Sequence, residues 1–244
     1  LDPYNEISMG VFADKTAEKY DISRQEQDDY AIRSYKNSLL ANESGIFANE
    51  IVGVSVPQRK EEPILIMEDE EYKTVKFEKI SQLRAAFTKT GTVTAANSST
   101  MNDGASALVL ASAEAVKNYN LNPIAKILSF ADAAQAPEWF TTAPTKAAPK
   151  ALSLAKMSTA DVDYFEVNEA FSVVPLAFNK ILDVDINKVN IHGGAVSMGH
   201  PLGASGARIV TTLINVLQTK DATIGCAAIC NGGGGASSIV IERL

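Results

Sequence analysis

Apolar and polar positions follow two different rhythms along this chain of 244 residues. Before residue 91, apolar positions recur at helical spacing and then give way to an extended, highly charged stretch. After residue 91, short apolar runs, glycine turns and amphipathic segments follow one another. Strands that alternate with helices in this way are typical of an α/β layered sheet.

Capping residues and apolar spacing predict the individual elements. Ser23 and Glu26 have the spacing of a capping box, which predicts a helix that begins after Ser23. Pro175 lies inside another predicted helix and should kink or weaken it. The other expected helices cover 144–155, 169–182 and the segment from 205 onwards; the expected strands cover 51–56, 92–96, 105–111, 162–167, 223–229 and 237–241; and 61–79 is expected to be a solvated loop.

A similarity between two segments of the chain suggests the domain organisation. Residues 102–111 (NDGASALVLA) are similar to residues 233–242 (GGGASSIVIE), and we interpret them as the closing strands of two copies of one domain. Only the second copy has a full set of α/β elements before its closing strand. We therefore expect a charged loop domain (1–90), the last strand and flanking region of a truncated first core domain (91–120), and a complete second core domain (121–244).

Composition narrows the class of protein. The net charge of −7 argues against a general nucleic-acid binder, and no apolar run approaches the length needed to span a membrane. Two cysteines cannot form a disulfide framework, which favours a reducing compartment. The chain starts at Leu1 without a Met or a targeting segment, so we expect the gene product to begin further upstream.

Three polar residues at predicted strand-to-turn junctions are the candidates for chemistry. His200 lies in a glycine-rich turn, Cys230 begins a run of four glycines, and Asn168 follows the strand VDYFEV. Each also has a structural interpretation: a bystander or core histidine, a small buried hydrophobe, or a helix N-cap. His192 lacks such a turn and is expected to be structural. Carboxyl ends of neighbouring strands meet at one sheet edge, so the three predict acyl or proton-transfer chemistry on an activated carbonyl.

The sequence motifs around these residues resemble those of the thiolases. VNEAF (167–171), GGAVSMGHPLGASGAR (193–208) and CNGGGGAS (230–237) are similar to the family's carboxy-terminal signatures, and AANSSTMNDGA (95–105) extends the match. The family's acetoacetyl-CoA thiolases (acetyl-CoA C-acetyltransferases) are the most similar. The resemblance implies a thiolase-like layered α-β-α sheet domain with a charged loop domain and a truncated first core domain.

The resemblance also implies roles for single residues. His200 would activate the nucleophile and bind the thioester oxygen, Asn168 would hold a water for that oxyanion hole, Cys230 would act as acid and base, and the Gly232 N–H would serve a second oxyanion hole. The implied CoA-binding residues are Ser99, Lys79 and Phe171, while Thr74 departs from an arginine found in some relatives. CoA is the substrate, so no cofactor is implied beyond a potassium ion, whose implied positions are Tyr35, Ala95, Ala96, Ser98 and Val196.

One departure from the family limits the expected activity. The nucleophilic cysteine of thiolases lies in an amino-terminal segment that this chain does not contain, and both cysteines here are carboxy-terminal. We therefore expect a fragment of an enzyme that interconverts two acetyl-CoA with acetoacetyl-CoA and CoA, inactive on its own. The alternatives are an inactive CoA- or acyl-binding module and a structural subunit that pairs with a complete thiolase.

The resemblance carries further expectations about cellular context. The partners would be acetyl-CoA and CoA, with no nucleic acid and no membrane. We expect a homodimer or homotetramer, a role in lipid metabolism and sterol or isoprenoid precursor synthesis, and a cytoplasmic location with the mitochondrion as the alternative.

Overall fold

The centre of the protein is a four-stranded mixed sheet, as seen in a computed structural model that describes residues 1–244. Its strand order is β3 (Ala125–Ala134), β6 (Gly235–Arg243), β5 (Ile224–Asn231) and β4 (Tyr164–Val167). The β5–β6 and β3–β6 pairs are antiparallel, whereas β4 runs parallel to β5. The carboxyl ends of β4 and β5 therefore lie at the same edge of the sheet.

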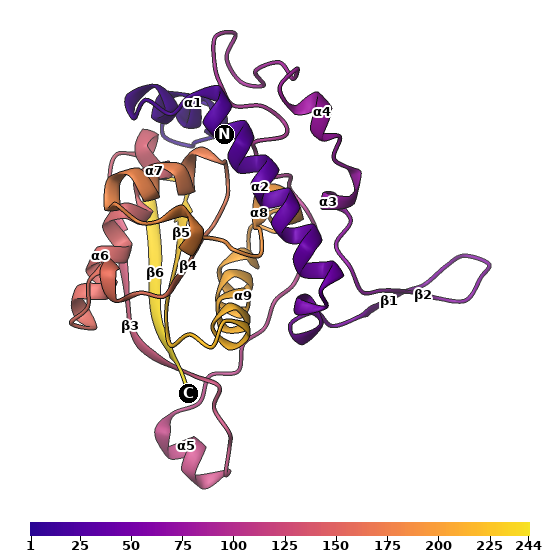
Figure 1. Ribbon diagram of the computed structural model, residues 1–244, viewed down its shortest axis with the longest axis vertical. Coiled ribbons are helices and arrows are strands. Elements are labelled where there is room, and N and C mark those ends of the chain that lie inside the picture. Colours follow the sequence, from indigo (N-terminus) through magenta and orange to yellow (C-terminus); the bar gives the residue numbers. More distant parts are fainter.

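Helices cover both faces of this sheet (Figure 1). Helices α6 (Pro144–Leu154) and α7 (Val173–Leu182) lie on one face, and α9 (Ser205–Thr219) lies on the other. The face beneath α6 and α7 contains the larger hydrophobic cluster, in which the ring centroids of Phe165 and Phe178 lie 5.7 Å apart. On the opposite face, Leu213 and Leu217 of α9 are buried against the sheet. The layered α-β-α arrangement expected from the sequence is thus observed.

Two helices at the amino-terminal end pack on the upper part of this unit (Figure 1). Helix α1 (Met9–Lys19) contacts α7 and the 3₁₀ helix η2 (Pro137–Thr142). Helix α2 (Arg24–Glu43) contacts the short helix α8 (Ala195–Met198). The capping box of Ser23 and Glu26 is present at the start of α2, as the sequence predicts.

The remaining elements are short, and two parts, the β1–β2 hairpin and α5, project from the body (Figure 1). Strands β1 (Val54–Val56) and β2 (Ile64–Ile66) form an exposed hairpin. The predicted strand at 51–56 is thus reduced to three residues, and the expected loop at 61–79 contains β2 and two single-turn helices. The other short elements are η1 (Ile46–Asn49), α3 (Glu71–Thr74), α4 (Phe77–Ile80), α5 (Ala113–Asn118), η3 (Thr159–Asp161) and η4 (Ile186–Lys188).

The predicted strands at 92–96 and 105–111 are wrong. Both segments lack strand structure, and the side chain of Val109 is 95% exposed. A strand needs a neighbour for its backbone hydrogen bonds, and no strand of the chain pairs with either segment. Of the two similar segments, only 233–242 overlaps a strand, β6. The division of the chain at residues 90 and 120 stays a prediction.

The helix that contains Pro175 differs from expectation at its start. It begins at Val173 rather than at residue 169, so Pro175 occupies its first turn. The missing N–H of a proline there has no intrahelical partner to lose, and the expected kink is not needed. The other predicted helices and the strands at 162–167, 223–229 and 237–241 are present with small shifts in their ends. No helix is both long and apolar enough to span a bilayer.

Candidate active site

Asn168 lies at the carboxyl end of β4. Its backbone N–H donates to the carbonyl of Ala228 on β5 at 2.9 Å, which continues the parallel pairing by one residue. The side chain is buried, and Oδ1 has no hydrogen-bond partner within the chain. The N-cap of α7 is Ser172, so the helix-capping interpretation of Asn168 is wrong. Its amide is therefore free to serve the site rather than a helix end.

His200 follows α8 and Gly199 rather than a strand. Gly199 has φ +90°, a conformation that glycine adopts without a steric penalty, and the chain turns there. The backbone N–H of His200 donates to the carbonyl of Thr100 at 2.8 Å. On the imidazole, Nε2 lies 3.3 Å from Nδ2 of Asn168, and Nδ1 lies 2.6 Å from Oγ of Ser205. The ring is thus held at both nitrogens.

The environment of His200 favours the neutral imidazole. Burial lowers its pKa to about 4, with a further contribution from the positive charge of Arg208. Burial alone disfavours the charged form of a histidine, and a nearby cation adds to this effect. At neutral pH, one ring nitrogen of His200 therefore carries a lone pair that can accept a proton.

Cys230 lies near the end of β5, two residues beyond Ala228, the carbonyl partner of Asn168. Its thiol is buried, and burial raises its pKa to about 12. No hydrogen bond joins the thiol to Asn168 or His200. The β4–β5 pairing nevertheless brings Cys230 and Asn168 to one edge of the sheet, while the direct contact within the trio is between Asn168 and His200.

Gly232 lies in the exposed turn between β5 and β6. No atom outside its chain neighbours would come within 4 Å of a Cβ there. Gly233 and Gly234 follow with φ of +84° and +85°, which the reversal of direction requires. The open space beside Gly232 leaves room for a ligand.

A buried carboxylate that the sequence did not single out connects the segments around the site. Glu169 is fully buried and accepts hydrogen bonds from four groups on three parts of the chain. The donors are the hydroxyls of Tyr30 and Ser34, both at 2.7 Å, the amide of Asn190 at 3.0 Å and the backbone N–H of Val196 at 3.0 Å. In the sequence, the one feature that could have pointed to Glu169 as a site residue is its position directly after Asn168.

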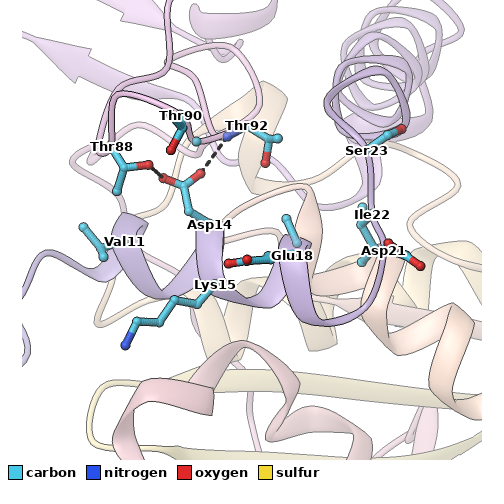
Figure 2. Close-up of a pocket in the computed structure, with 12 residues that line it drawn as sticks. Val11, Asp14, Lys15, Glu18, Asp21, Ile22, Ser23, Thr88, Thr90 and Thr92 are labelled. Atoms are coloured by element: carbon cyan, nitrogen blue, oxygen red, sulfur yellow. Dashed lines mark hydrogen bonds between the residues drawn. The ribbon is translucent and has the colours of Figure 1, made fainter.

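The structure has two cavities of note, one beside α1 and one beside the segment that follows His200. The larger, of ≈ 680 Å³, lies between α1 and the segment 88–92. Figure 2 shows the carboxylate of Asp14 in it, bound by the hydroxyl of Thr88 and the backbone N–H of Thr92. None of the predicted site residues lines this cavity. A second hollow of ≈ 460 Å³ is formed by 102–106 and 201–204, directly after His200 in the sequence.

Comparison with known proteins identifies the family. Residues 1–114 match the description "Thiolase, N-terminal domain", and residues 121–243 match "Thiolase, C-terminal domain". The chain belongs to the thiolase family. The resemblance from which the residue roles were inferred is thereby confirmed at the level of the family, although no comparison tests the roles of single residues.

Several relatives of this thiolase chain are named acetyl-CoA acetyltransferases. It is 54% identical over 244 residues to acetyl-CoA acetyltransferase of Schizosaccharomyces pombe, covering 100% of this chain and 62% of the relative. It is 55% identical over 243 residues to the mitochondrial acetyl-CoA acetyltransferase of Danio rerio, covering 99% of this chain and 57% of the relative. The chain therefore spans about 60% of the length of the curated relatives it matches.

Solved structures of other thiolases have the same fold. The Acat5 thiolase of Ascaris suum in complex with coenzyme A matches with a TM-score of 0.92 and 45% identity, over 100% of this chain and 62% of that one. The acetyl-CoA acetyltransferase of Bacillus anthracis matches with a TM-score of 0.96 and 40% identity, with the same coverage. The expected thiolase fold is confirmed.

Two of the three expected CoA-binding residues lie together in this thiolase. Ser99 donates to the carbonyl of Ala170 through both its N–H and its hydroxyl, at 3.1 and 2.9 Å. Phe171 follows, and its ring packs edge-on against Phe87 and Phe140. Lys79 lies apart from them, in the last turn of α4.

The residues expected around potassium are partly assembled. Tyr35 and Val196 share a small buried cluster. Burial raises the pKa of Tyr35 to about 12, so its hydroxyl is neutral and could serve as an oxygen ligand. Ala95, Ala96 and Ser98 lie in an irregular segment that offers backbone carbonyls, the ligand type that hard cations accept. These residues fit such an ion, and the site stays a prediction.

Proposed function

We propose that this chain is the part of an acetyl-CoA acetyltransferase that supplies its acid–base residues. The observation that carries the proposal is the contact of Asn168 with a neutral, buried His200 at the sheet edge where Cys230 also lies. The names of the relatives support acetyl-CoA as the substrate. The coenzyme A complex of the Ascaris suum thiolase supports a CoA thioester as the ligand.

Each group is in the protonation state that the first half-reaction requires. In acyl transfer, the neutral His200 accepts the proton of an attacking thiol, and the carbon–sulfur bond of the thioester breaks. The thiol of Cys230, protonated at neutral pH because its pKa is raised to about 12, gives its proton to the departing CoA thiolate. Asn168 holds a water beside His200, and together they stabilise the oxyanion.

The second half-reaction reverses the role of Cys230. As a thiolate, it removes a proton from the methyl group of a second acetyl-CoA, and the resulting carbanion attacks the acyl carbonyl. The thioester bond between the acyl carbon and the sulfur of the nucleophile then breaks, and acetoacetyl-CoA leaves. The N–H of Gly232, beside open space, stabilises the enolate oxygen. Cys226 and Cys230 are both buried. We expect neither of them to supply the nucleophilic thiol, and we therefore expect no acetyl-enzyme from these 244 residues alone.

Calorimetric titration with CoA and intact-mass measurement after incubation with acetyl-CoA test this function. We expect CoA to bind and no acetyl group to be added. Lys79→Ala should weaken CoA binding about 3- to 10-fold by removing a phosphate contact, whereas Lys117→Ala, a matched change on α5, should leave it unchanged. Absence of binding at millimolar CoA would overturn the proposal, and an acetylated chain would overturn the predicted inactivity.

Assembly and location are part of the same proposal. A homodimer or homotetramer, predicted from the family, is tested by light scattering on the purified chain. Several relatives are named as mitochondrial, which supports the mitochondrion, the alternative to the expected cytoplasm. A role in lipid and sterol precursor synthesis follows from acetoacetyl-CoA as product.

Potassium dependence is tested by repeating the CoA titration with potassium replaced by sodium.

A further inference from the structure

The imidazole of His200 takes part in a hydrogen-bond chain that involves a residue with no assigned role. Ser205 is the first residue of α9 and is fully buried. Its Oγ lies 2.6 Å from Nδ1 of His200 and 3.2 Å from the carbonyl oxygen of Pro201. These are the hydroxyl's two polar contacts.

The far end of this chain determines its direction. The atom of Asn168 that faces Nε2 of His200 is the amide nitrogen Nδ2, at 3.3 Å. An amide nitrogen can only donate, so Nε2 must accept. A neutral imidazole has one donor and one acceptor nitrogen, and the proton therefore resides on Nδ1.

The near end is consistent with this direction. With its proton on Nδ1, the ring donates to Oγ of Ser205. The single hydroxyl proton of Ser205 is then directed to the carbonyl of Pro201, which also accepts the backbone N–H groups of Ala204 and Ser205. Each of the three hydrogen bonds from Asn168 to Pro201 thus has one donor and one acceptor. The opposite tautomer would place two donors against each other at Nε2.

We propose that Ser205 is a positioning residue that holds His200 in the Nδ1–H tautomer and so directs the lone pair of Nε2 towards Asn168. The lowered pKa of His200 supports a neutral ring at pH 7. The catalytic meaning rests on the proposed function, because a lone pair at Nε2 is what accepting a proton from an attacking thiol requires. The tautomer itself does not depend on that function.

Nitrogen-15 NMR of the chain at pH 7 reads the tautomer directly, because protonated and unprotonated ring nitrogens resonate far apart. The sequence has only two histidines, and a His192→Gln variant assigns the signals. We expect His200 as Nδ1–H. His192, whose Nε2 lies 3.5 Å from a Thr219 hydroxyl that already donates to backbone carbonyls, is expected as Nε2–H and provides an internal reference.

Substitution of Ser205 tests the cause. Ser205→Ala removes the acceptor, and the ratio of Nδ1–H to Nε2–H should fall about 2- to 12-fold, the equivalent of one hydrogen bond of about 0.5–1.5 kcal/mol. Ser205→Thr keeps a hydroxyl and should retain the native ratio, whereas Ser205→Val, which has the shape of threonine without the hydroxyl, should lower the ratio as Ser205→Ala does. The signals of His192 should be unchanged in all three.

The outcomes separate this inference from the proposed function. An Nε2–H form of His200 in the unsubstituted chain overturns it, even if no Ser205 variant folds. A ratio of Nδ1–H to Nε2–H that is unchanged in Ser205→Ala and Ser205→Val overturns the role of Ser205. The CoA titration reports on the proposed function alone, so either proposal can fail without the other.

Discussion

The carboxylate of Glu169 accepts a hydrogen bond of 3.0 Å from the backbone N–H of Val196. Glu169 directly follows Asn168, and Val196 precedes His200 by four residues. This one bond therefore joins the two segments that carry the interacting pair. The hydroxyls of Tyr30 and Ser34 bind the same carboxylate from α2, which fixes both segments against the helix.

Replacing Glu169 with Gln should destabilise the chain and disturb the pair. An amide nitrogen would face a donor where a carboxylate oxygen now accepts, which leaves a buried group unpaired. We expect a loss of about 2–4 kcal/mol in the free energy of unfolding, measured by urea denaturation. Glu242→Gln, which removes only a surface ion pair with Lys126, should change it by less than about 0.5 kcal/mol. Equal losses in the two variants would contradict this account of Glu169.

Acid should destabilise the chain through its two histidines. Burial is the main cause that lowers the pKa of both His200 and His192 to about 4, from an ordinary value of 6.5. Between pH 6.5 and 4 the unfolded state therefore binds more protons than the folded state, so stability is complete above about pH 6.5 and falls as the pH drops. Each histidine adds up to about 1.4 kcal/mol per pH unit to the slope. Urea midpoints from pH 4.5 to 7.5 measure it, and the slope should decrease in His192→Gln. A slope that this variant leaves unchanged would refute the assignment.

The turn before His200 should not tolerate a side chain at Gly199. A Cβ there would lie 2.2 Å from Oδ1 of Asn102, and the φ of +90° is unfavourable for other residues. Gly199→Ala should cost about 1–3 kcal/mol and shift the ring signals of His200. Gly203→Ala, four residues further along the same turn, has no atom within 4 Å of the added methyl and should be neutral. Thermal unfolding and NMR of the two variants give the comparison.

Both cysteines should react slowly in the folded chain. Burial raises the pKa of Cys226 to about 11 and that of Cys230 to about 12, so little thiolate is present at pH 8. We expect a colorimetric thiol reagent to react roughly 10²–10³-fold more slowly with the native chain than with the chain in denaturant. Two fast thiols in the native state would show that the β4–β5 edge is open to solvent.

The exposed segment 105–111 gives a test of the corrected strand. Leu110 is 76% exposed, whereas Leu213 of α9 is fully buried. Leu110→Ala should change the unfolding free energy by less than about 0.5 kcal/mol, and Leu213→Ala should lower it by about 2–5 kcal/mol. A large loss in Leu110→Ala would mean that this segment pairs with another part of the chain or with a second copy.

Local signals predicted the elements whose stability is local. The capping box at Ser23 and the apolar spacing in α9 gave the correct helices because both act within a few residues. Strand β3 was not foreseen, since AKILSFADAA shows no clean alternation and its pairing with β6, more than a hundred residues later, decides its structure. Segment 105–111 fails for the converse reason: an apolar run without a partner strand stays irregular.

The candidate site was predictable in its outline and not in its support. The convergence of Asn168 and Cys230 follows from the rule that parallel strands end at one edge. The contacts of Glu169 with Tyr30 and Ser34 span 139 and 135 residues of sequence, and no periodic pattern in the sequence predicts them. Ser205 was predicted as the start of a helix after a glycine-rich turn, but its contact with His200 depends on how α9 is oriented.

His200 is bound at one nitrogen by the end of a strand and at the other by the start of a helix on the opposite face of the sheet from α6 and α7. Its orientation therefore records the relative position of those two elements. Loosening of the apolar contacts beneath α9 should therefore change the orientation of the ring. The hydrophobic packing of this layer therefore helps to set the geometry of the His200 imidazole.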